Sequence, residues 1–161
     1  MATTIKKVQL WKCQVDNRPG ALDAILAPLA EAGADLSIVF GWVNPGDPTR
    51  ATIEVAPIRG KKITEAARSV GLEPDEVPVI VVEGLNKPGL GHRLAEAIAA
   101  KGINMTFVVA QVVGRNYGAV FGFQSAEDAT KATRIIKTAL AARKGTNRRK
   151  STKKKAALAR R

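Results

Sequence analysis

Two short loops of this sequence carry the residues best suited to hold a small ligand. Residues 16–22 read DNRPGAL, and residues 85–91 read LNKPGLG. In each loop a Pro-Gly pair lets the chain turn sharply from a strand into a helix, so the amides of the first helical turn face outward. These amides and the helix dipole favour a carboxylate. Asn17 and Asn86 stand beside them with a donor and an acceptor, which suits a zwitterionic amino acid.

The same asparagines also have a purely structural explanation, because Asn is common in turns, where its side chain bonds the local backbone. The two loops differ in the helices that follow them. Leu22 and Leu26 of the first correspond to Gly91 and Ala95 of the second. The smaller residues either let the second helix pack more closely or leave space for a ligand. Our hypothesis is that they leave space for a ligand.

Catalysis is disfavoured by the shortage of reactive groups. The chain has one His and one Cys, and no recognisable motif places a second titratable group beside either. The second loop lacks the Gly-Lys-Ser/Thr ending of a phosphate loop, and residues 89–94 fail the dinucleotide pattern at its last Gly. We therefore predict a protein that is not an enzyme and uses neither a cofactor nor a metal.

The remaining His, Cys and Trp residues are expected to be structural. The helical spacing places His92 on a polar, exposed face. Cys13 lies in a strand-like run and is predicted to pack in the core. Trp11 and Trp42 are predicted to pack against strands, since the chain is otherwise poor in aromatic residues.

The strongly positive charge belongs to one end of the chain. The net charge is +12, but residues 141–161 hold ten Lys and Arg and no acid, which leaves a net +2 over the first 140 residues. Such a segment cannot bury much apolar surface, so we predict a disordered basic tail. The single Cys, the lack of a signal-peptide pattern and the lack of a long apolar run predict a cytoplasmic protein with no membrane contact.

An internal repeat organises the rest of the sequence. A shift of 69 residues aligns the two loops and the following helices without a gap. It pairs Asn17 with Asn86, and it also pairs the Pro-Gly residues of the loops and the Gly residues that end the helices. The chain therefore contains a duplicated unit.

Each unit reads as strand, helix, strand, strand, helix. The first unit is expected to contain a strand over 5–15, a helix over 19–32 with Pro19 at its first position, strands over 34–43 and 50–57, and a helix over 61–72. The second is expected to contain strands over 77–84, 103–113 and 117–123, a helix over 88–102, and a last helix opened by Ser125 in a SAED sequence that resembles a capping box.

This order predicts an α+β fold of two ferredoxin-like units, each with an antiparallel sheet and two helices on one face. That fold normally has a fourth strand, and each unit looks one strand short. We therefore expect the two units to lie side by side in one shared sheet. The predicted boundaries are 1–74 for the first unit, 75–142 for the second and 143–161 for the tail.

The strand, the Asn-basic-Pro-Gly loop, the amphipathic helix, and then Gly with ADLSIV or INMTFV resemble the ACT domain, twice over residues 5–140. The loop is most similar to the serine-sensing regulatory domain of phosphoglycerate dehydrogenase, and the whole chain resembles stand-alone tandem ACT proteins. The resemblance implies an effector held between two units by the loop Asn and by a second Asn at the start of the following strand.

The second unit of this chain matches that implied site better than the first unit does. Asn86 and Asn104 match both places, whereas Asn17 is followed by Asp35 at the second place. Leu85 also replaces the acid that Asp16 supplies, and Pro28 interrupts the first helix. The candidate ligand-binding residues are Asn17, Pro19, Gly20, Asp35, Asn86, Gly89, Leu90, Gly91 and Asn104.

The sequence thus predicts a regulatory sensor of a small amino acid or related metabolite, acting as a homodimer or on a regulated protein partner. The alternative is nonspecific nucleic-acid binding by the tail, although the body shows no basic face or aromatic platform. The residues that would carry it are Arg148, Arg149, Lys150, Lys153, Lys154 and Lys155. A third possibility is a purely structural, oligomerising role.

Overall fold

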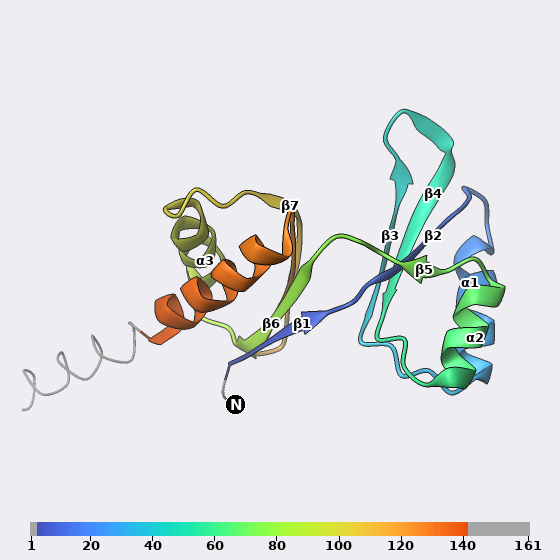
Figure 1. Cartoon of the computed structure of the whole chain (residues 1–161), viewed down its shortest axis with the longest axis horizontal. Coiled ribbons are helices and arrows are strands. Elements are labelled where there is room, and N and C mark those ends of the chain that lie inside the picture. The colour runs from blue at the N-terminus through green and yellow to red at the C-terminus, as the bar shows by residue number, and fades with distance from the viewer. Residues whose placement is uncertain (1–2, 142–161) are drawn as a thin grey trace, which may run out of the picture. The chain divides into compact units, whose positions relative to one another are not determined.

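The chain forms two compact units, each with its own sheet and helices (Figure 1). The structure is a computed structural model that describes residues 3–141. The first unit comprises Lys7–Val79, and among the described residues the second joins 3–6 to 80–141. The six basic tail residues proposed for nucleic-acid binding lie outside the described residues.

The first unit has strands in the order β3-β4-β2-β5, and all of its neighbouring strands are antiparallel. Side chains alternate across this sheet, so Trp11, Cys13, Ile53 and Val55 enter the core on one face. Ile25 and other apolar residues of the two helices cover them. The elements are β2 (Trp11–Asp16), α1 (Ala21–Glu31), β3 (Ile38–Asn44), β4 (Asp47–Ala56), α2 (Lys61–Ser69) and β5 (Glu73–Pro74).

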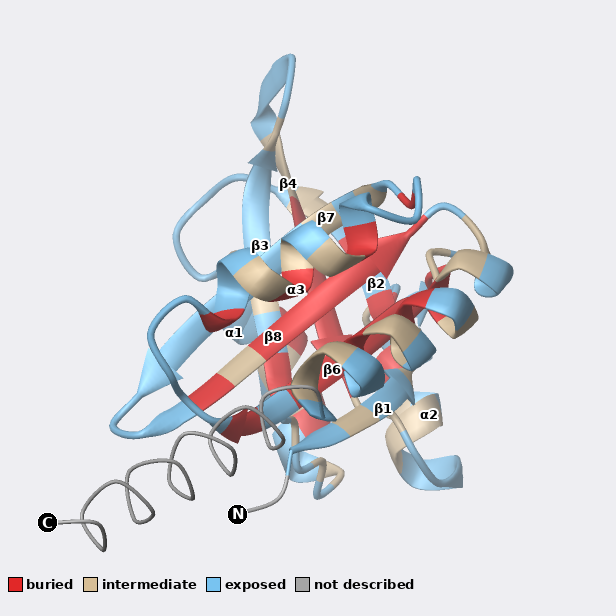
Figure 2. Cartoon of the chain, turned by 90° about the vertical axis from the view of Figure 1, so that its left-hand side faces the viewer, coloured by how far each residue is buried: buried red, intermediate tan, exposed pale blue. Residues whose placement is uncertain are grey.

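The second unit has strands in the order β1-β6-β8-β7. Its core lies on the inner strands, and Figure 2 shows buried residues running along β6 and β8. The helices contribute Leu94, Ile98 and Ile136 to this core. The elements are β1 (Thr4–Val8), β6 (Val79–Leu85), α3 (Leu90–Ala99), β7 (Met105–Val113), β8 (Asn116–Phe123) and a helix over 126–141.

The expected shortage of strands is wrong, because the N-terminal stretch makes two strands that serve different sheets. β1 belongs to the second unit and β2 to the first, while the two-residue β5 completes the first sheet. The predicted single shared sheet is therefore also wrong, and the boundary 1–74 assigns the N-terminal residues to the wrong unit. Gln9 lies between the two strands, and its side-chain amide donates to the carbonyls of Leu10 at 3.1 Å and Asp75 at 2.5 Å.

The other elements confirm the α+β, ferredoxin-like prediction. Trp11 and Cys13 are buried and His92 is exposed, as expected. The Ser125 hydroxyl accepts a hydrogen bond from the Asp128 amide at 3.0 Å, so it caps the last helix. Trp42 is the exception, because it is 41% exposed on the edge strand β3 and stacks on Phe40. Within residues 3–141, no helix is long and apolar enough to cross a membrane.

Candidate functional site

Both Pro-Gly pairs form the same tight turn before a helix. The amide of Ala21 donates to the Arg18 carbonyl at 3.2 Å, and Gly20 has φ 85° and ψ −8°, which are the values of a type II turn. In the second unit the Leu90 amide donates to the Lys87 carbonyl at 3.0 Å, and Gly89 has φ 73°. The helices thus begin after the glycines, which corrects the prediction that Pro19 is the first helical residue.

The backbone holds the two loops in place in the same way. The Asn17 amide donates to the Thr49 carbonyl and the Asn86 amide to the Arg115 carbonyl, both at 2.8 Å. The Asn17 side-chain amide also donates to the Pro48 carbonyl at 2.9 Å. Asn17 therefore has a structural role through its NH₂ group, while its side-chain oxygen remains available as an acceptor.

The turn provides an acceptor for one amide of the first helical turn and leaves two amides without one. An α-helix cannot satisfy its first amides internally, and neither α1 nor α3 has a side-chain cap at its start. Since the turn uses the Ala21 amide, the amides of Leu22 and Asp23 remain open at the start of α1. The residues Gly91 and His92 hold the same positions in α3.

Gly20 in the turn and Gly91 within α3 give a matched stability test. Gly20→Ala should lower the free energy of unfolding by about 1–2 kcal/mol, because an alanine rarely adopts a positive φ. No atom lies within 4 Å of the added Cβ, so the cost would come from the backbone alone. Gly91→Ala, within α3 and equally uncrowded, should be neutral or slightly stabilising. Urea denaturation followed by circular dichroism measures both, and equal losses would contradict this account.

In the first unit the loop opens onto a groove between α1 and the edge strand β3. We call it the α1–β3 groove; it has a volume of about 330 Å³ and is lined by residues 15–18, 21–22, 39–43 and 51–53. Asn17 and Arg18 form its polar end. Leu22, Val39 and Val43 are exposed apolar residues of its lining.

The second predicted ligand-binding position, Asp35 or Asn104, does not lie beside the loop of its own unit. β2 and β3 are both antiparallel to β4, so they run in the same direction. Asn17 follows the end of β2, whereas Asp35 precedes the start of β3, about 20 Å away along the sheet. Likewise Asn86 contacts Arg115 after β7, whereas Asn104 precedes β7. A site that combines both positions needs a second unit.

The remaining predicted site residues have different surroundings. Pro19 and Gly20, like Pro88 and Gly89, shape the turns and are exposed. Leu90 is buried in the core of the second unit, so its side chain is not open to a ligand. No atom lies within 4 Å of a Cβ built on Gly91, so this position has the open space that our hypothesis requires. Its use by a ligand stays a prediction.

A charged cluster that no sequence motif marks lies on the first sheet's other face, where the carboxylates of Glu54 and Asp75 are buried and Lys12 is exposed. Lys12 and Glu54 are cross-strand partners there, and the Lys12 ammonium is 2.5 Å from the Asp75 carboxylate. Glu54 is 4% exposed, and its Oε2 has no hydrogen-bond partner among the described residues. Burial, and to a lesser degree Asp75, raises the pKa of the Glu54 carboxyl to about 7, against the lowering effect of Lys12.

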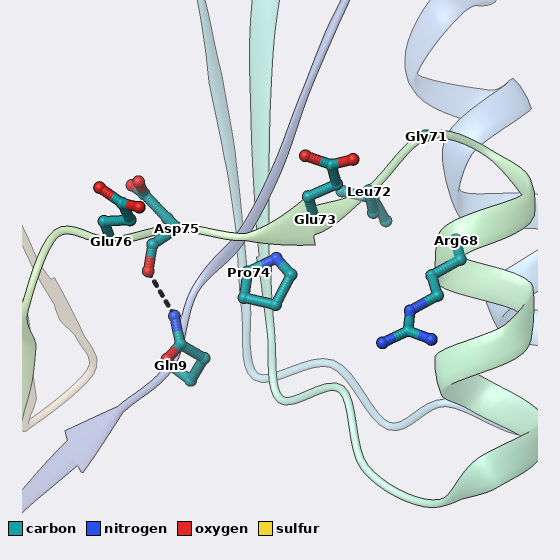
Figure 3. Close-up of a pocket in the computed structure, with 8 residues that line it drawn as sticks. All are labelled: Gln9, Arg68, Gly71, Leu72, Glu73, Pro74, Asp75 and Glu76. Carbon is teal, nitrogen blue, oxygen red and sulfur yellow. Dashed lines mark hydrogen bonds between the residues drawn. The ribbon is translucent and has the colours of Figure 1, made fainter.

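A second cavity borders this cluster but offers no free buried group. It is lined by Gln9, Arg68 and residues 71–76 (Figure 3). Asp75 is the buried polar residue in this lining, and its carboxylate already binds Lys12 while its carbonyl accepts the Gln9 amide. The α1–β3 groove is thus the better candidate site.

Comparison with known proteins identifies the fold. No family model matches the chain, and no curated protein matches its sequence. Protein BT0572 from Bacteroides thetaiotaomicron is similar in structure, with a TM-score of 0.67 and 15% identity over 83% of this chain and 90% of that chain.

Two regulatory subunits of aspartate kinase are also similar in structure. The subunit from Thermus thermophilus, in its ligand-free form, has a TM-score of 0.59 and 17% identity over 85% of this chain and 95% of that chain. The subunit from Thermus flavus has a TM-score of 0.54 and 17% identity over 87% of this chain and 97% of that chain. The specific likeness to phosphoglycerate dehydrogenase stays a prediction. The chain shares with these regulatory subunits a fold of two ferredoxin-like units.

Proposed function

We propose that this protein is a non-enzymatic regulatory module that binds a small amino acid or related metabolite at its Asn-basic-Pro-Gly loops. The observation that carries the proposal is the repeated turn. In both units the same backbone bonds fix the loop and leave helix amides open beside an Asn. A carboxylate suits these amides, and an ammonium group suits the asparagine oxygen.

The α1–β3 groove gives this loop room for a ligand in the first unit. Its volume of about 330 Å³ is near the lower end of the range for small-molecule sites. The fold shared with regulatory subunits of aspartate kinase supports a regulatory role over a catalytic one. The second predicted position, at Asp35 or Asn104, would then come from a unit of another copy.

Pairing with another copy is supported by the edge strands. β3 and β7 each end a sheet, so one side of each strand has no partner strand within its own sheet. β7 carries no charged residue, and Val108, Val109, Val112 and Val113 are exposed on it. Uncharged, apolar edges favour pairing with a further strand. Ligand binding at the loops would bias this pairing and so signal to a regulated partner.

A thermal-shift screen of the full chain against the twenty amino acids tests the proposal. A binding amino acid at about a hundred times its Kd should raise Tm by roughly 5 °C or more, because it stabilises only the folded state. Arg18→Gln and Asn86→Ala should reduce the shift, whereas Lys101→Gln, exposed after α3, should leave it unchanged. If no amino acid raises Tm at millimolar concentration, the proposal is wrong.

A further inference from the structure

The walls of the α1–β3 groove are unusually apolar for an open surface. Leu22, Val39 and Val43 are 46%, 42% and 47% exposed, and Trp42 borders them. They come from the first turn of α1 and from the edge strand β3, so they gather around one hollow. Large apolar side chains clustered at a concave surface are typical of a binding site rather than of ordinary protein surface.

Two of the polar residues that line the groove, Asp16 and Thr52, already bind side chains outside its lining. Asp16 pairs with Arg50 at 2.5 Å. The Thr52 hydroxyl donates to the Asn44 side-chain oxygen at 2.7 Å. The polar groups left for a ligand are the Asn17 oxygen and the Arg18 guanidinium, which pairs with no described residue.

These free groups lie in the loop, at the polar end of the groove. Arg18 and the open first-turn amides of α1 can hold a carboxylate, and the Asn17 oxygen can accept from an ammonium group. The wall formed by Leu22, Val39 and Val43 then faces the rest of the ligand. A polar or charged side chain placed there would lose water without finding a partner.

We infer that the ligand of this groove is an amino acid with an apolar side chain, aliphatic or aromatic, rather than serine, aspartate or lysine. This inference rests on the proposed function and adds the chemical class of the ligand. Leu22, Val39 and Val43 determine that class, and the loop recognises the groups that all amino acids share.

The test is the same amino-acid screen, followed by calorimetric titration of the wild type and two matched valine variants. Val43→Thr keeps a β-branched residue of similar size but adds a hydroxyl to the groove wall. It should weaken the binding of an apolar amino acid about tenfold. Val77→Thr makes the same change at a half-buried valine between β5 and β6, outside the groove and outside the edge strands, and should leave the affinity unchanged. The oligomeric mass of each variant is measured alongside, so that altered pairing is not mistaken for altered binding.

The possible results distinguish the inference about the ligand class from the proposed function on which it rests. Binding of leucine, isoleucine, valine, methionine or phenylalanine that Val43→Thr weakens would support the inference. Binding of a polar amino acid, or of an apolar one with equal affinity for both variants, would overturn the inference while leaving the proposed function standing. If none of the twenty amino acids binds, both fail.

Discussion

A chain that begins at Gln9 is expected to lose stability in the second unit and to keep the fold of the first. The truncation removes β1, which forms an edge of the second sheet, while β2 and the rest of the first sheet remain. Ile5 of β1 also packs against the second core. The loss should be on the order of 3 kcal/mol, because each backbone hydrogen bond contributes about 0.5–1.5 kcal/mol and a five-residue strand makes several.

Hydrogen exchange followed by mass spectrometry can locate this loss. Peptides from 80–123 should exchange faster in the truncated chain, while peptides from 11–56 should not change. Ile5→Asn should reproduce the effect more weakly in the full chain. Lys6→Asn is the matched control, because Lys6 is exposed and its ion pair with Glu83 spans 3.6 Å at the surface. Faster exchange confined to 11–56 would show that β1 supports the first unit instead.

Because of Glu54, the first unit is expected to become less stable as pH rises from about 4.5 to 7. Below this range Glu54 is protonated in both states. Within it, the unfolded chain ionises while the folded chain keeps the proton, because the pKa of buried Glu54 is raised to about 7. Above it, Glu54 is charged in both states. The free energy of unfolding should fall by roughly 1–3 kcal/mol, since one pKa unit corresponds to about 1.4 kcal/mol and water reaches Lys12 nearby.

Glu54→Gln isolates this contribution, because glutamine resembles the protonated carboxyl and does not titrate. The variant should match the wild type near pH 4.5 and be more stable at pH 8. Urea denaturation followed by tryptophan fluorescence reports on this unit, since Trp11 and Trp42 both belong to it. Glu65→Gln, at an exposed helical position, should show no such trend. If the free energy of unfolding differs between the wild type and Glu54→Gln by the same amount at pH 5 and pH 8, the pKa of Glu54 is not raised by the fold.

The sequence predicts most elements because their signals are local. Pro-Gly pairs, the strand alternation of Trp11 and Cys13, and the helical spacing of apolar residues all act within a few residues. The repeat adds the duplicated architecture, since segments with the same pattern of residues fold alike. The type II turns follow from the same Pro-Gly chemistry, although both helices begin two residues later than their prolines suggest.

The tertiary structure decided what depends on distant contacts. The sequence reads as one strand over 5–15, yet the packed fold divides this stretch into β1 and β2 and places β1 in the sheet of the second unit. The placement of Asn17 and Asp35 at opposite ends of one sheet follows from strand directions that no local pattern encodes.

Burial has the same dependence on the whole fold. Glu54 belongs to an alternating strand, where a polar residue normally faces solvent, and Trp42 is predicted to pack against strands. The structure buries Glu54 because β4 is an inner strand, and it leaves Trp42 exposed because β3 is an edge. The sequence by itself thus determined the repeated loop and its turn chemistry, which are local. Pairing between distant strands determined the four-stranded sheets, the buried carboxyl and the apolar groove beside the loop.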